Sequence, residues 1–406
     1  MTKPSHDLII VGGGPAGLTL ALALVKAVPG IAIAVLDRRA FSAPKDYRAS
    51  AIAAGVRRVF EEVGIWEQVA PTAEPVRQMK ITDSGTGDIA RPLFLRFDGE
   101  VAPGEPFAHL VPNTSVAAAL LDALAGRVEF LAPVEVTGYS ATAALGRISL
   151  ADGRLLSAPL VVASDGANSA LRTMAGIGTF GHAYGQAGIV TTIAHELAHE
   201  GTAYEHFRPS GPFASLPLPG RRSSLVWTET LETAAAVKAM QPAEIARRIE
   251  AVMGSSLGAV RLEEEGVQTF PLRLQLARSF VAPRLALIGD AAHVVHPIAG
   301  QGLNLGLKDV AALAEVMVEA MRLGLDHGSA DQLARYQRWR RLDTALMAMV
   351  TDGMNRLFSN DIAVLRALRD VGLGMVDRLG PVKDFLIGHA AGIERGGPRL
   401  LRGLPI

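Results

Sequence analysis

A glycine-rich turn between a strand and a helix near the N-terminus restricts the fold of this chain more than any other feature. In residues 7–11 (DLIIV), the four residues after Asp7 are apolar and mostly β-branched. Residues 12–17 read GGGPAG, and the run LTLALALVKAV that follows has helical character. Glycines in this G-x-G-x-x-G spacing permit a tight turn and let the backbone approach a pyrophosphate at the helix N-terminus. The pattern predicts an α/β, Rossmann-like fold that binds a dinucleotide, and a glycine-rich turn without a ligand is the alternative. The expected contacts are Gly12, Gly14, Pro15, Ala16 and Gly17.

The next expected strand ends in an acidic residue at the position that this fold uses for ribose. The apolar run IAIAVLD ends at Asp37, 20 residues after Gly17, and a carboxylate at that distance reaches the ribose hydroxyls. It would repel a 2′-phosphate, so the adenosine is expected to be unphosphorylated. Arg38, which follows directly, is included among the expected cofactor contacts.

Two later segments repeat the order of buried strand, polar turn and helix. Residues 160–172 read LVVASDGANSALR, with Asp165 in the turn. Residues 285–306 read LALIGDAAHVVHPIAGQGLNLG, with Gly289 and Asp290 in the turn and a helix opening near Gly302. Three polar turns at strand ends imply one extended cofactor across the carboxyl edge of a sheet.

The composition excludes several other classes of protein. The chain of 406 residues has no cysteine, which rules out disulfides, thiolate catalysis, iron–sulfur clusters and cysteine-bound zinc. Its 40 basic residues balance 40 acidic ones, so no global charge favours a nucleic acid as a partner. No apolar run reaches membrane-spanning length, and the first motif leaves no space for a targeting sequence. We therefore expect a cytoplasmic protein.

The stretch HELAH at residues 195–199 matches the H-E-x-x-H pattern of zinc hydrolases. Two histidines in this spacing share a zinc ion only on a helix, where such positions are about 6 Å apart. On a strand they are about 13 Å apart. The preceding GIVTTIA is β-branched, and Thr202 and Glu205 stand where the extended zinc pattern needs Gly and His. We expect no metal site, with His195 and His199 along or at the end of a strand.

The remaining segments predict a β-rich part that interrupts the nucleotide fold. Residues 76–108 and 182–274 alternate apolar and polar side chains between frequent glycines and prolines, which is typical of an antiparallel sheet. The expected cofactor domain then comprises residues 1–75, 109–181 and 275–330, with the substrate between it and the inserted sheet. A second G-x-G-x-x-G match at residues 176–181 has no strand before it, so a loop crossing between the domains is expected there.

Residues 331–406 are expected to form a C-terminal helical region. Its first part combines an apolar stripe with a basic cluster. The stripe consists of Leu333, Tyr336, Leu342, Met349 and Leu357, and the cluster consists of Arg335, Arg338, Arg340 and Arg341. Two interpretations stay open: a helix packed on the cofactor domain with a solvated face, or a surface for membrane lipid or a partner protein.

The three turn motifs together resemble the group A flavoprotein aromatic hydroxylases, whose FAD-binding domain is of the glutathione-reductase type and similar to that of para-hydroxybenzoate hydroxylase. The resemblance implies that the dinucleotide is FAD, that Asp290 holds its ribityl chain, and that residues 297–304 (PIAGQGLN) lie against the isoalloxazine. It also implies that the following helix points its positive end at the flavin, where reduced flavin is negatively charged. Arg48 and Asn113 stand where this group makes further FAD contacts, and for Arg48 an ordinary surface ion pair is the alternative. The other expected contacts are Asp165, Gly289, Pro297, Gly300, Gln301, Gly302, Leu303 and Asn304.

Longer stretches resemble, more narrowly, the FAD-dependent hydroxylases of ubiquinone biosynthesis. These stretches are AYEHFRPSGPFASLPLP, GDAAHVVHPIAGQGLNLGLKD and YQRWRRLDTALMAMVTDGMNRLFSND, and the similarity extends over essentially the whole chain. It implies a monooxygenase that hydroxylates the aromatic ring of a polyprenylated phenol. NAD(P)H or another donor would reduce FAD, O₂ would add at flavin C4a, and the hydroperoxide would pass its distal oxygen to the ring. The implied partners are the phenol, other ubiquinone-biosynthesis proteins and the surface of the inner membrane.

His296 and Pro297 are the residues that we expect beside the reacting oxygen. The cofactor carries the hard chemistry, so the protein has to exclude water, position the ring and supply fixed dipoles. For His296, a structural histidine hydrogen-bonded to the backbone is the alternative. Two other functions also stay open: hydroxylation of a small soluble phenol, and a non-catalytic flavin-binding scaffold in a quinone-synthesis complex.

Overall fold

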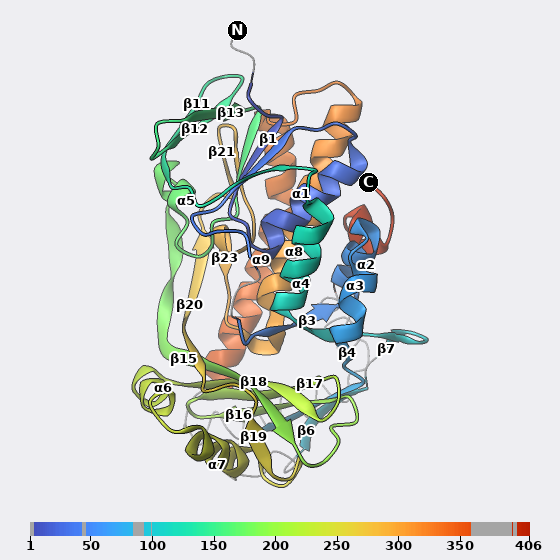
Figure 1. Ribbon diagram of the computed structural model, residues 1–406, viewed down its shortest axis with the longest axis vertical. Helices are drawn as coiled ribbons and strands as arrows, with labels where there is room; N and C mark the ends of the chain where they lie inside the picture. The colour runs from blue at the N-terminus through green and yellow to red at the C-terminus, as the bar shows by residue number, and fades with distance from the viewer. Residues whose placement is uncertain (1–3, 43–45, 84–92, 99, 359–391, 393–395) are drawn as a thin grey trace.

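The computed structural model describes residues 4–42, 46–83, 93–98, 100–358, 392 and 396–406. Two sheets dominate this part of the chain. One is covered by the longest helices, the other lies at the opposite end of the molecule, and a pair of long strands runs between them (Figure 1).

The first sheet is parallel over most of its width. In spatial order its strands are β10 (Glu129–Leu131), β2 (Ile33–Leu36), β1 (Leu8–Val11), β14 (Leu160–Ala163), β22 (Leu285–Leu287) and β21 (Val281–Ala282). Neighbours run parallel except β21, which is antiparallel to β22. Every residue of β1, β2, β14 and β22 is buried, as expected for central strands covered on both faces.

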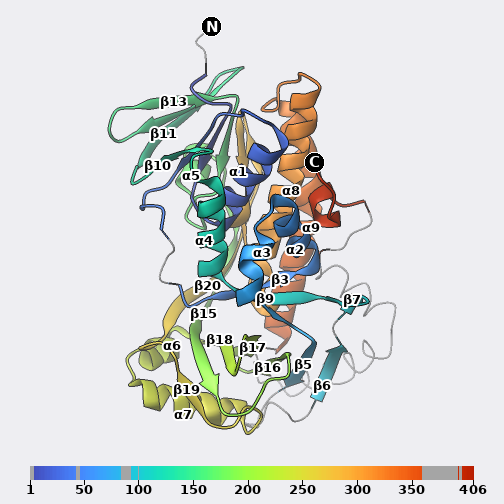
Figure 2. The same ribbon diagram turned by 45° about the vertical axis from the view of Figure 1, so that its right-hand side comes forward.

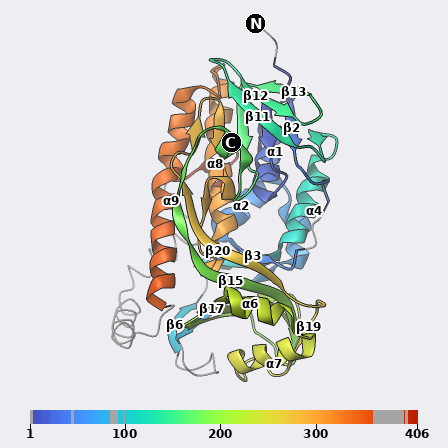
Figure 3. The same cartoon turned by 90° about the vertical axis from the view of Figure 1, so that its left-hand side faces the viewer.

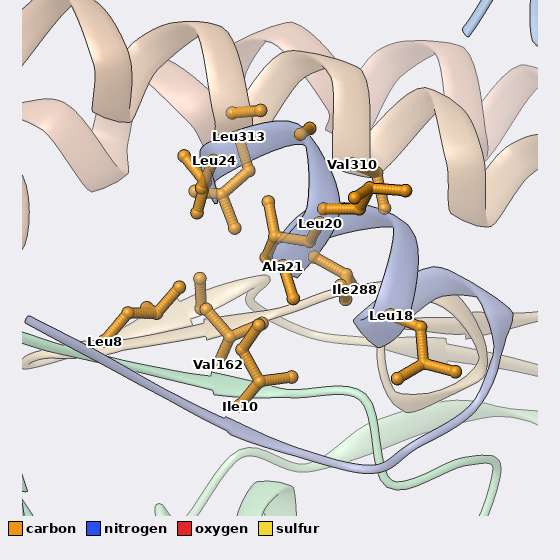
Figure 4. Packing of buried hydrophobic residues seen from close by; sticks show 14 of the residues in the cluster. Leu8, Ile10, Leu18, Leu20, Ala21, Leu24, Val162, Ile288, Val310 and Leu313 are labelled. Carbon is orange, nitrogen blue, oxygen red and sulfur yellow. The ribbon is translucent and has the colours of Figure 1, made fainter. Parts of the chain in front are cut away.

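Helices pack against this sheet and form the main core with it. They include α1 (Pro15–Ala27), α4 (Asn113–Leu124), α8 (Gln301–Arg322) and α9 (Ala330–Phe358). Figure 4 shows α1 between the sheet and α8: Leu20 and Leu24 lie between strand residues such as Val162 and helix residues such as Leu313. Each such fully buried aliphatic side chain contributes about 1.5–3 kcal/mol, so this core fixes the strand ends that carry the turns.

The second sheet is a mixed one. Its strands, in spatial order, are β23 (His293–Val294), β20 (Gln268–Ala277), β15 (Thr179–His195), β18 (Arg222–Thr230), β17 (Gly211–Leu218), β16 (Thr202–Arg208), β5 (Gln78–Asp83) and β6 (Leu93–Asp98), and β19 (Val260–Leu262) also pairs with β15. Helices α6 (Leu231–Lys238) and α7 (Pro242–Met253) cover one face around Phe213 and Trp227. On the opposite face, Ala203 and Leu216 pack against β3 (Ala49–Ala53). This face of the second sheet is therefore turned toward the first sheet.

Strands β15 and β20 connect the two sheets. They pair with each other along most of their length, with a register shift between Ala183 and Ala187. In Figure 3 this pair curves from beside the first sheet down into the second, next to the long helix α9. The second sheet therefore extends along β15 and β20 toward the first, although no described strand of one sheet pairs with the other.

Smaller elements complete the described chain. A three-stranded sheet joins β3 to β9 (Ala108–Pro112) and β4 (Glu74–Pro75), and the hairpin of β7 (Glu100–Ala102) and β8 (Glu105–Pro106) projects from it (Figure 2). Another sheet consists of β11 (Val136–Ala141), β12 (Gly146–Leu150) and β13 (Leu155–Ala158). The short helices are α2 (Ala54–Val63), α3 (Trp66–Val69), α5 (Ala170–Met174), η1 (Ala70–Thr72), η2 (Gly289–Ala291), η3 (Ile298–Gly300) and η4 (Arg399–Arg402).

The structure confirms the three strand–turn–helix units and corrects several other predictions. Residues 182–274 contain α6 and α7 as well as strands, and β16 runs parallel to β5, so the inserted sheet is not purely antiparallel. The second glycine motif is a loop only up to Gly178, because β15 begins at Thr179. The helical prediction for residues 331–406 holds for α9, whereas residues 359–391 lie outside the described chain. The residue limits of the domains stay a prediction.

Candidate cofactor and active site

The first two turns are in direct contact. Gly12 has a φ of +114°, and a Cβ atom there would lie 2.1 Å from the carbonyl oxygen of Ser164. The Ser164 N–H also donates a hydrogen bond to the carbonyl oxygen of Val11 at 2.7 Å. A side chain at position 12 would push the two turns apart, so glycine is required for both the conformation and the close approach.

The third turn joins the other two through small residues and one buried arginine. Gly289 (φ +58°) packs against helix α8, since a Cβ atom at Gly306 would lie 3.2 Å from the Cα atom of Gly289. A Cβ atom at Gly289 would in turn lie 3.4 Å from the Cβ atom of Ala16 in α1. Arg172, which follows the second turn, donates to the carbonyl oxygens of Ala291 at 2.9 Å and Ala167 at 3.1 Å. The three turns therefore converge at one edge of the first sheet.

The N-terminus of α1 is open for a phosphate group. Gly14 is its N-cap, and within the described chain the first turn has no side-chain cap and no acidic residue. No described atom lies within 4 Å of the position that a Cβ atom at Gly14 would occupy. Free backbone N–H groups and the helix dipole make such an end an anion site.

Asp37 lies next to this turn. Its Oδ2 accepts a hydrogen bond from the Gly13 N–H at 2.8 Å, and its Oδ1 accepts one from the Arg39 N–H at 2.9 Å. Arg38 is exposed beside it. Asp37 thus shapes the glycine turn, in addition to its expected ribose contact.

The predicted contacts Arg48 and Asn113 lie side by side. The Asn113 N–H donates to the Arg48 carbonyl oxygen at 3.1 Å, and its side chain accepts from the Ser50 hydroxyl at 2.7 Å. The Arg48 guanidinium pairs with Asp46 at 2.7 Å and lies 4.8 Å from the ring centre of Phe270. The hydrogen bonds and charge of Asp46 raise the pKa of Arg48. The ion pair that was the alternative for Arg48 is present, and a contact with FAD stays a prediction.

The carboxyl groups of Asp165 in the second turn and Asp290 in the third turn are only partly compensated by the described residues around them. Asp165 accepts a hydrogen bond from the Leu171 N–H at 3.2 Å, while its buried Oδ1 has no partner among the described residues. Asp290 is exposed, yet the surrounding protein desolvates its carboxyl and raises its pKa, against the nearby charges of His293, Arg48 and Arg273.

The N-terminus of α8 is a second open helix end. Gly300 (φ +64°) is its N-cap, with no side-chain cap in the described chain, and the Cβ position of Gly302 has no described atom within 4 Å. Gln301 is buried and Leu303 is half-buried, so they support the turn from behind. The Asn304 side chain donates to the Ala51 carbonyl oxygen at 2.8 Å and accepts from the Ala53 N–H at 3.1 Å. It therefore holds β3 against α8.

His296 lies just before this helix end, next to the half-buried Pro297, and is itself fully buried. Neither of its ring nitrogens has a hydrogen-bond partner among the described residues, so the alternative of a backbone-bonded histidine does not hold there. Its ring meets that of Tyr184 edge to face at 5.0 Å, and the Tyr184 hydroxyl donates to Asp352 at 3.0 Å. Burial, only partly offset by Asp352, lowers the pKa of His296 to about 4. The neutral ring offers one donor and one acceptor, and leaving them unpaired costs on the order of 1–3 kcal/mol.

The HELAH histidines do not present a metal site. His195 is the last residue of β15, as predicted, whereas His199 lies beyond the strand, with its ring centre 5.7 Å from that of His195, so an extended strand does not keep the two rings apart. The ring nitrogens of His195 bond the Leu197 carbonyl oxygen at 2.7 Å and the Ser223 hydroxyl at 3.1 Å. The His199 ring bonds the Leu218 carbonyl oxygen at 2.9 Å and the Gly201 N–H at 3.0 Å. All four nitrogens are engaged, and no group of three metal-ligating side chains occurs among the described residues.

Comparisons with known proteins agree with this geometry. A family profile described as an FAD binding domain matches residues 5–350. The ubiquinone hydroxylase UbiL of Rhodospirillum rubrum is 42% identical, with 98% of this chain and 93% of that protein covered. The chain belongs to the FAD-dependent hydroxylases of ubiquinone biosynthesis. It is an FAD-dependent monooxygenase.

Further similarities place this hydroxylase in its fold class. The 3-demethoxyubiquinol 3-hydroxylase of Escherichia coli is 34% identical, covering 97% of this chain and all of that protein. The crystal structure of p-nitrophenol 4-monooxygenase PnpA from Pseudomonas putida superimposes with a TM-score of 0.80 at 19% identity, covering 97% and 100% of the two chains. The fold is thus that of the flavoprotein aromatic hydroxylases.

The residues of this hydroxylase fit FAD. Several features converge on one region among the described residues. They are two helix N-termini without a side-chain cap, the open Cβ positions of the glycines in these turns, and a carboxyl oxygen of Asp165 without a hydrogen-bond partner.

The sequence interpretation missed three supporting side chains, Arg172, Tyr184 and Asp352. Arg172 lies in the second turn motif, LVVASDGANSALR, and in the last turn of the short helix α5. A basic residue at that place interacts favourably with the C-terminal end of a helix, so the sequence could have indicated a structural role for it. The other two meet across the fold, and no local pattern marks them.

Proposed function

We propose that this hydroxylase adds oxygen to the aromatic ring of a polyprenylated phenol in ubiquinone biosynthesis. The observation that carries the proposal is the convergence of three distant turns with a buried His296 beside the N-terminus of α8, whose ring nitrogens have no partner in the part of the chain that the structure describes. The names of the relatives UbiL and 3-demethoxyubiquinol 3-hydroxylase support the substrate class.

Each part of the site has an assigned task in this proposal. When bound, reduced FAD supplies the activation of O₂, with NAD(P)H or another donor as the source of electrons. The α1 N-terminus binds the diphosphate, Asp37 binds the ribose and Asp290 the ribityl chain. The α8 N-terminus stabilises negative charge on the flavin ring. Arg48 and Asn113 add further contacts at the edge.

His296 is proposed to bind and orient the phenol hydroxyl. Its pKa of about 4 leaves it neutral at physiological pH, so one ring nitrogen can accept a hydrogen bond from the phenol. Pro297 follows it directly and fixes the backbone next to the reacting ring. His296→Ala should retain FAD and lose about a hundredfold in hydroxylation rate, the scale expected when a reacting ring is no longer held in position. Unchanged hydroxylation in a flavin-loaded variant would remove His296 from the mechanism.

An apolar patch lies on the face of the second sheet turned toward this region. Ala203, Leu216 and Leu218 pack there with Leu110 of β9 and with Ala51 of β3, which lies next to Gly300. Such a face excludes water from the reacting oxygen and suits an apolar polyprenyl tail.

Helix α9 is proposed as the place of peripheral contact with the membrane. Among the described residues no helix combines the length and apolar character needed to cross a bilayer. However, α9 exposes Leu342 (69%), Leu346 (43%) and Met349 (63%), which recur on one helical face. Arg338 and Arg341 are exposed near the start of this face, and a surface hollow is lined by Arg335, Arg338 and Trp339. Apolar side chains beside arginines suit an anionic lipid surface, and other ubiquinone-biosynthesis proteins are proposed partners at the same face.

The decisive experiment is complementation of bacterial strains that lack individual ubiquinone hydroxylases, with analysis of the quinone intermediates by mass spectrometry. Restoration of ubiquinone, with loss of one accumulated intermediate, is the expected result and identifies the ring position. No restoration, together with phenol-stimulated NADH oxidation by the purified protein, would favour a small soluble phenol. A purified protein that holds FAD but neither restores ubiquinone nor oxidises NADH in the presence of phenols would favour the scaffold.

A further inference from the structure

One fully buried carboxylate connects the third cofactor turn to the C-terminal helix. Asp309 lies on α8 with its side chain inaccessible to solvent. Its Oδ2 accepts hydrogen bonds from the Gly289 N–H at 2.9 Å and from His293 at 2.6 Å. Its Oδ1 accepts a hydrogen bond from Arg340 of α9 at 2.7 Å. This side chain of α8 therefore bonds to two segments that are distant from each other in sequence, the third turn and α9.

Arg340 makes this connection a charged one. Its side chain is 4% exposed, and it also pairs with Asp343 at 2.5 Å, close to Lys308. This placement corrects the sequence interpretation, which counted Arg340 in a basic surface cluster. Burial tends to raise the pKa of Asp309, but His293 and Arg340 outweigh it and hold the pKa below its usual value. A buried carboxylate stays ionised only with such partners, so each end of the pair depends on the other.

The position of the turn depends on this carboxylate. Gly289 adopts the left-handed conformation and has close backbone contacts with α8 on one side, and the next residue is Asp290. The hydrogen bond to Asp309 fixes the Ile288–Gly289 peptide plane, which directly precedes the Gly289–Asp290 peptide. Helix α9 adds a second contact to the same strand end, because the buried Tyr336 hydroxyl donates to the Leu287 carbonyl oxygen at 2.7 Å.

We propose that Asp309 is a positioning residue for the flavin: it holds the Gly289–Asp290 turn in its binding conformation, and its pairing with Arg340 makes cofactor retention depend on the docking of α9. Asp309 does not touch the cofactor itself. The inference rests on the proposed function in so far as FAD is the ligand of this turn. Because the linkage is reciprocal, bound FAD should also stabilise α9 against the rest of the protein.

The test compares FAD binding to refolded or deflavinated apoprotein for Asp309→Asn, Arg340→Lys and a matched control. Asp309→Asn keeps the side-chain shape but loses the charge and one acceptor oxygen, and Arg340→Lys keeps the charge but loses the planar donor pair. The control is Glu319→Gln, since Glu319 and Arg335 form another carboxylate–guanidinium pair between α8 and α9, at 2.5 Å, which is partly exposed. Binding is followed by quenching of flavin fluorescence, and folding of each apoprotein by circular dichroism.

We expect the FAD dissociation constant to rise at least about tenfold in Asp309→Asn, the usual scale for one charge-assisted hydrogen bond, and less in Arg340→Lys. It should change by less than about twofold in Glu319→Gln. At saturating FAD, the visible absorption bands of the flavin should shift in Asp309→Asn, which a purely structural role would not cause. The proposal would be overturned if both Asp309→Asn and Arg340→Lys bound FAD with wild-type affinity. It would also be overturned if Glu319→Gln lost as much FAD affinity as they do. If Asp309→Asn does not fold, Arg340→Lys decides by the same criteria. Failure of the wild-type protein to bind FAD would instead overturn the proposed function.

Discussion

At the scale of single residues, two glycines of the first turn have opposite surroundings. Gly12 is closed in by the second turn, with Ser164 where its side chain would be, whereas the Cβ position of Gly14 is open. The first glycine is needed for the protein to fold around the turn. The second is needed for a ligand to approach it.

Gly14→Ala separates ligand binding from folding. Gly14 has an ordinary extended backbone (φ −77°), so the variant should keep the thermal stability of the wild-type apoprotein. Its FAD affinity should fall about tenfold or more, because the added methyl group occupies the space of the diphosphate. Gly266→Ala is the matched control, since its Cβ position is equally open and far from the turns in sequence. Equal FAD affinity in the two variants, measured by fluorescence titration, would contradict the assigned position of the diphosphate.

His296 should make the protein sensitive to acid. Burial lowers its pKa to about 4, while in the unfolded chain the pKa is 6.5. Between these values the unfolded chain binds a proton that the folded chain does not, so the free energy of unfolding falls as the pH decreases. The expected loss is about 2 kcal/mol between pH 7.5 and 5. Denaturant titrations at both pH values should show a smaller decline in His296→Asn. His109, whose pKa burial also lowers to about 4, should give an additive effect in the double variant. An unchanged decline in His296→Asn would count against the buried neutral ring.

At the scale of elements, α9 has a buried face from Leu333 to Asn355 and an exposed apolar patch on another face of its second half. Leu333 and Tyr336 belong to the main core, whereas Leu342 and Met349 are exposed. The apolar stripe read from the sequence is therefore not one surface. Its first part holds the helix in place, and its second part is free to contact a lipid or protein surface.

The exposed apolar side chains of α9, Leu342, Leu346 and Met349, should be required for membrane association. The wild-type protein should float with vesicles that contain anionic lipid at low salt, and Leu342→Glu combined with Leu346→Glu should abolish flotation. Both side chains are exposed, so stability should change by less than about 1 kcal/mol. Leu155→Glu on β13 is the control, because Leu155 is 74% exposed but lies elsewhere, and it should float normally. A wild-type protein that stays in the soluble fraction would refute the proposed contact.

Local sequence patterns correctly predicted the elements whose conformation is determined by neighbouring residues. The glycine turns and the buried strands around them were found because their residues have one main structural solution. Helices α6 and α7 were missed, although Pro242 stands at a helix N-terminus, because the alternating strands on either side dominated the pattern. The burial of Arg340 could not be read from the sequence, since a charge count does not say which face of a helix meets Asp309.

At the scale of the whole molecule, cofactor and fold should stabilise each other. The proposed FAD site is built from residues of β1, β14, β22 and α8, which only the folded chain brings together. FAD at a hundred times its dissociation constant should add about 2.7 kcal/mol to the free energy of unfolding. Thermal melts of apoprotein with increasing FAD measure this gain, and riboflavin, which lacks the diphosphate and adenosine, should give much less. Equal stabilisation by both ligands would place the binding elsewhere.

The order of the strands in the first sheet also has a consequence for synthesis. The central strand β1 is made first, but its neighbour β14 and then β22 follow only after long intervening segments, and α8 comes later still. A growing polypeptide on the ribosome has no complete site until α8 and the docking helix α9 have been added, long after the glycine turn has emerged. Flavin capture is thus a late event in the life of the nascent chain, and prematurely terminated fragments should leave the ribosome colourless.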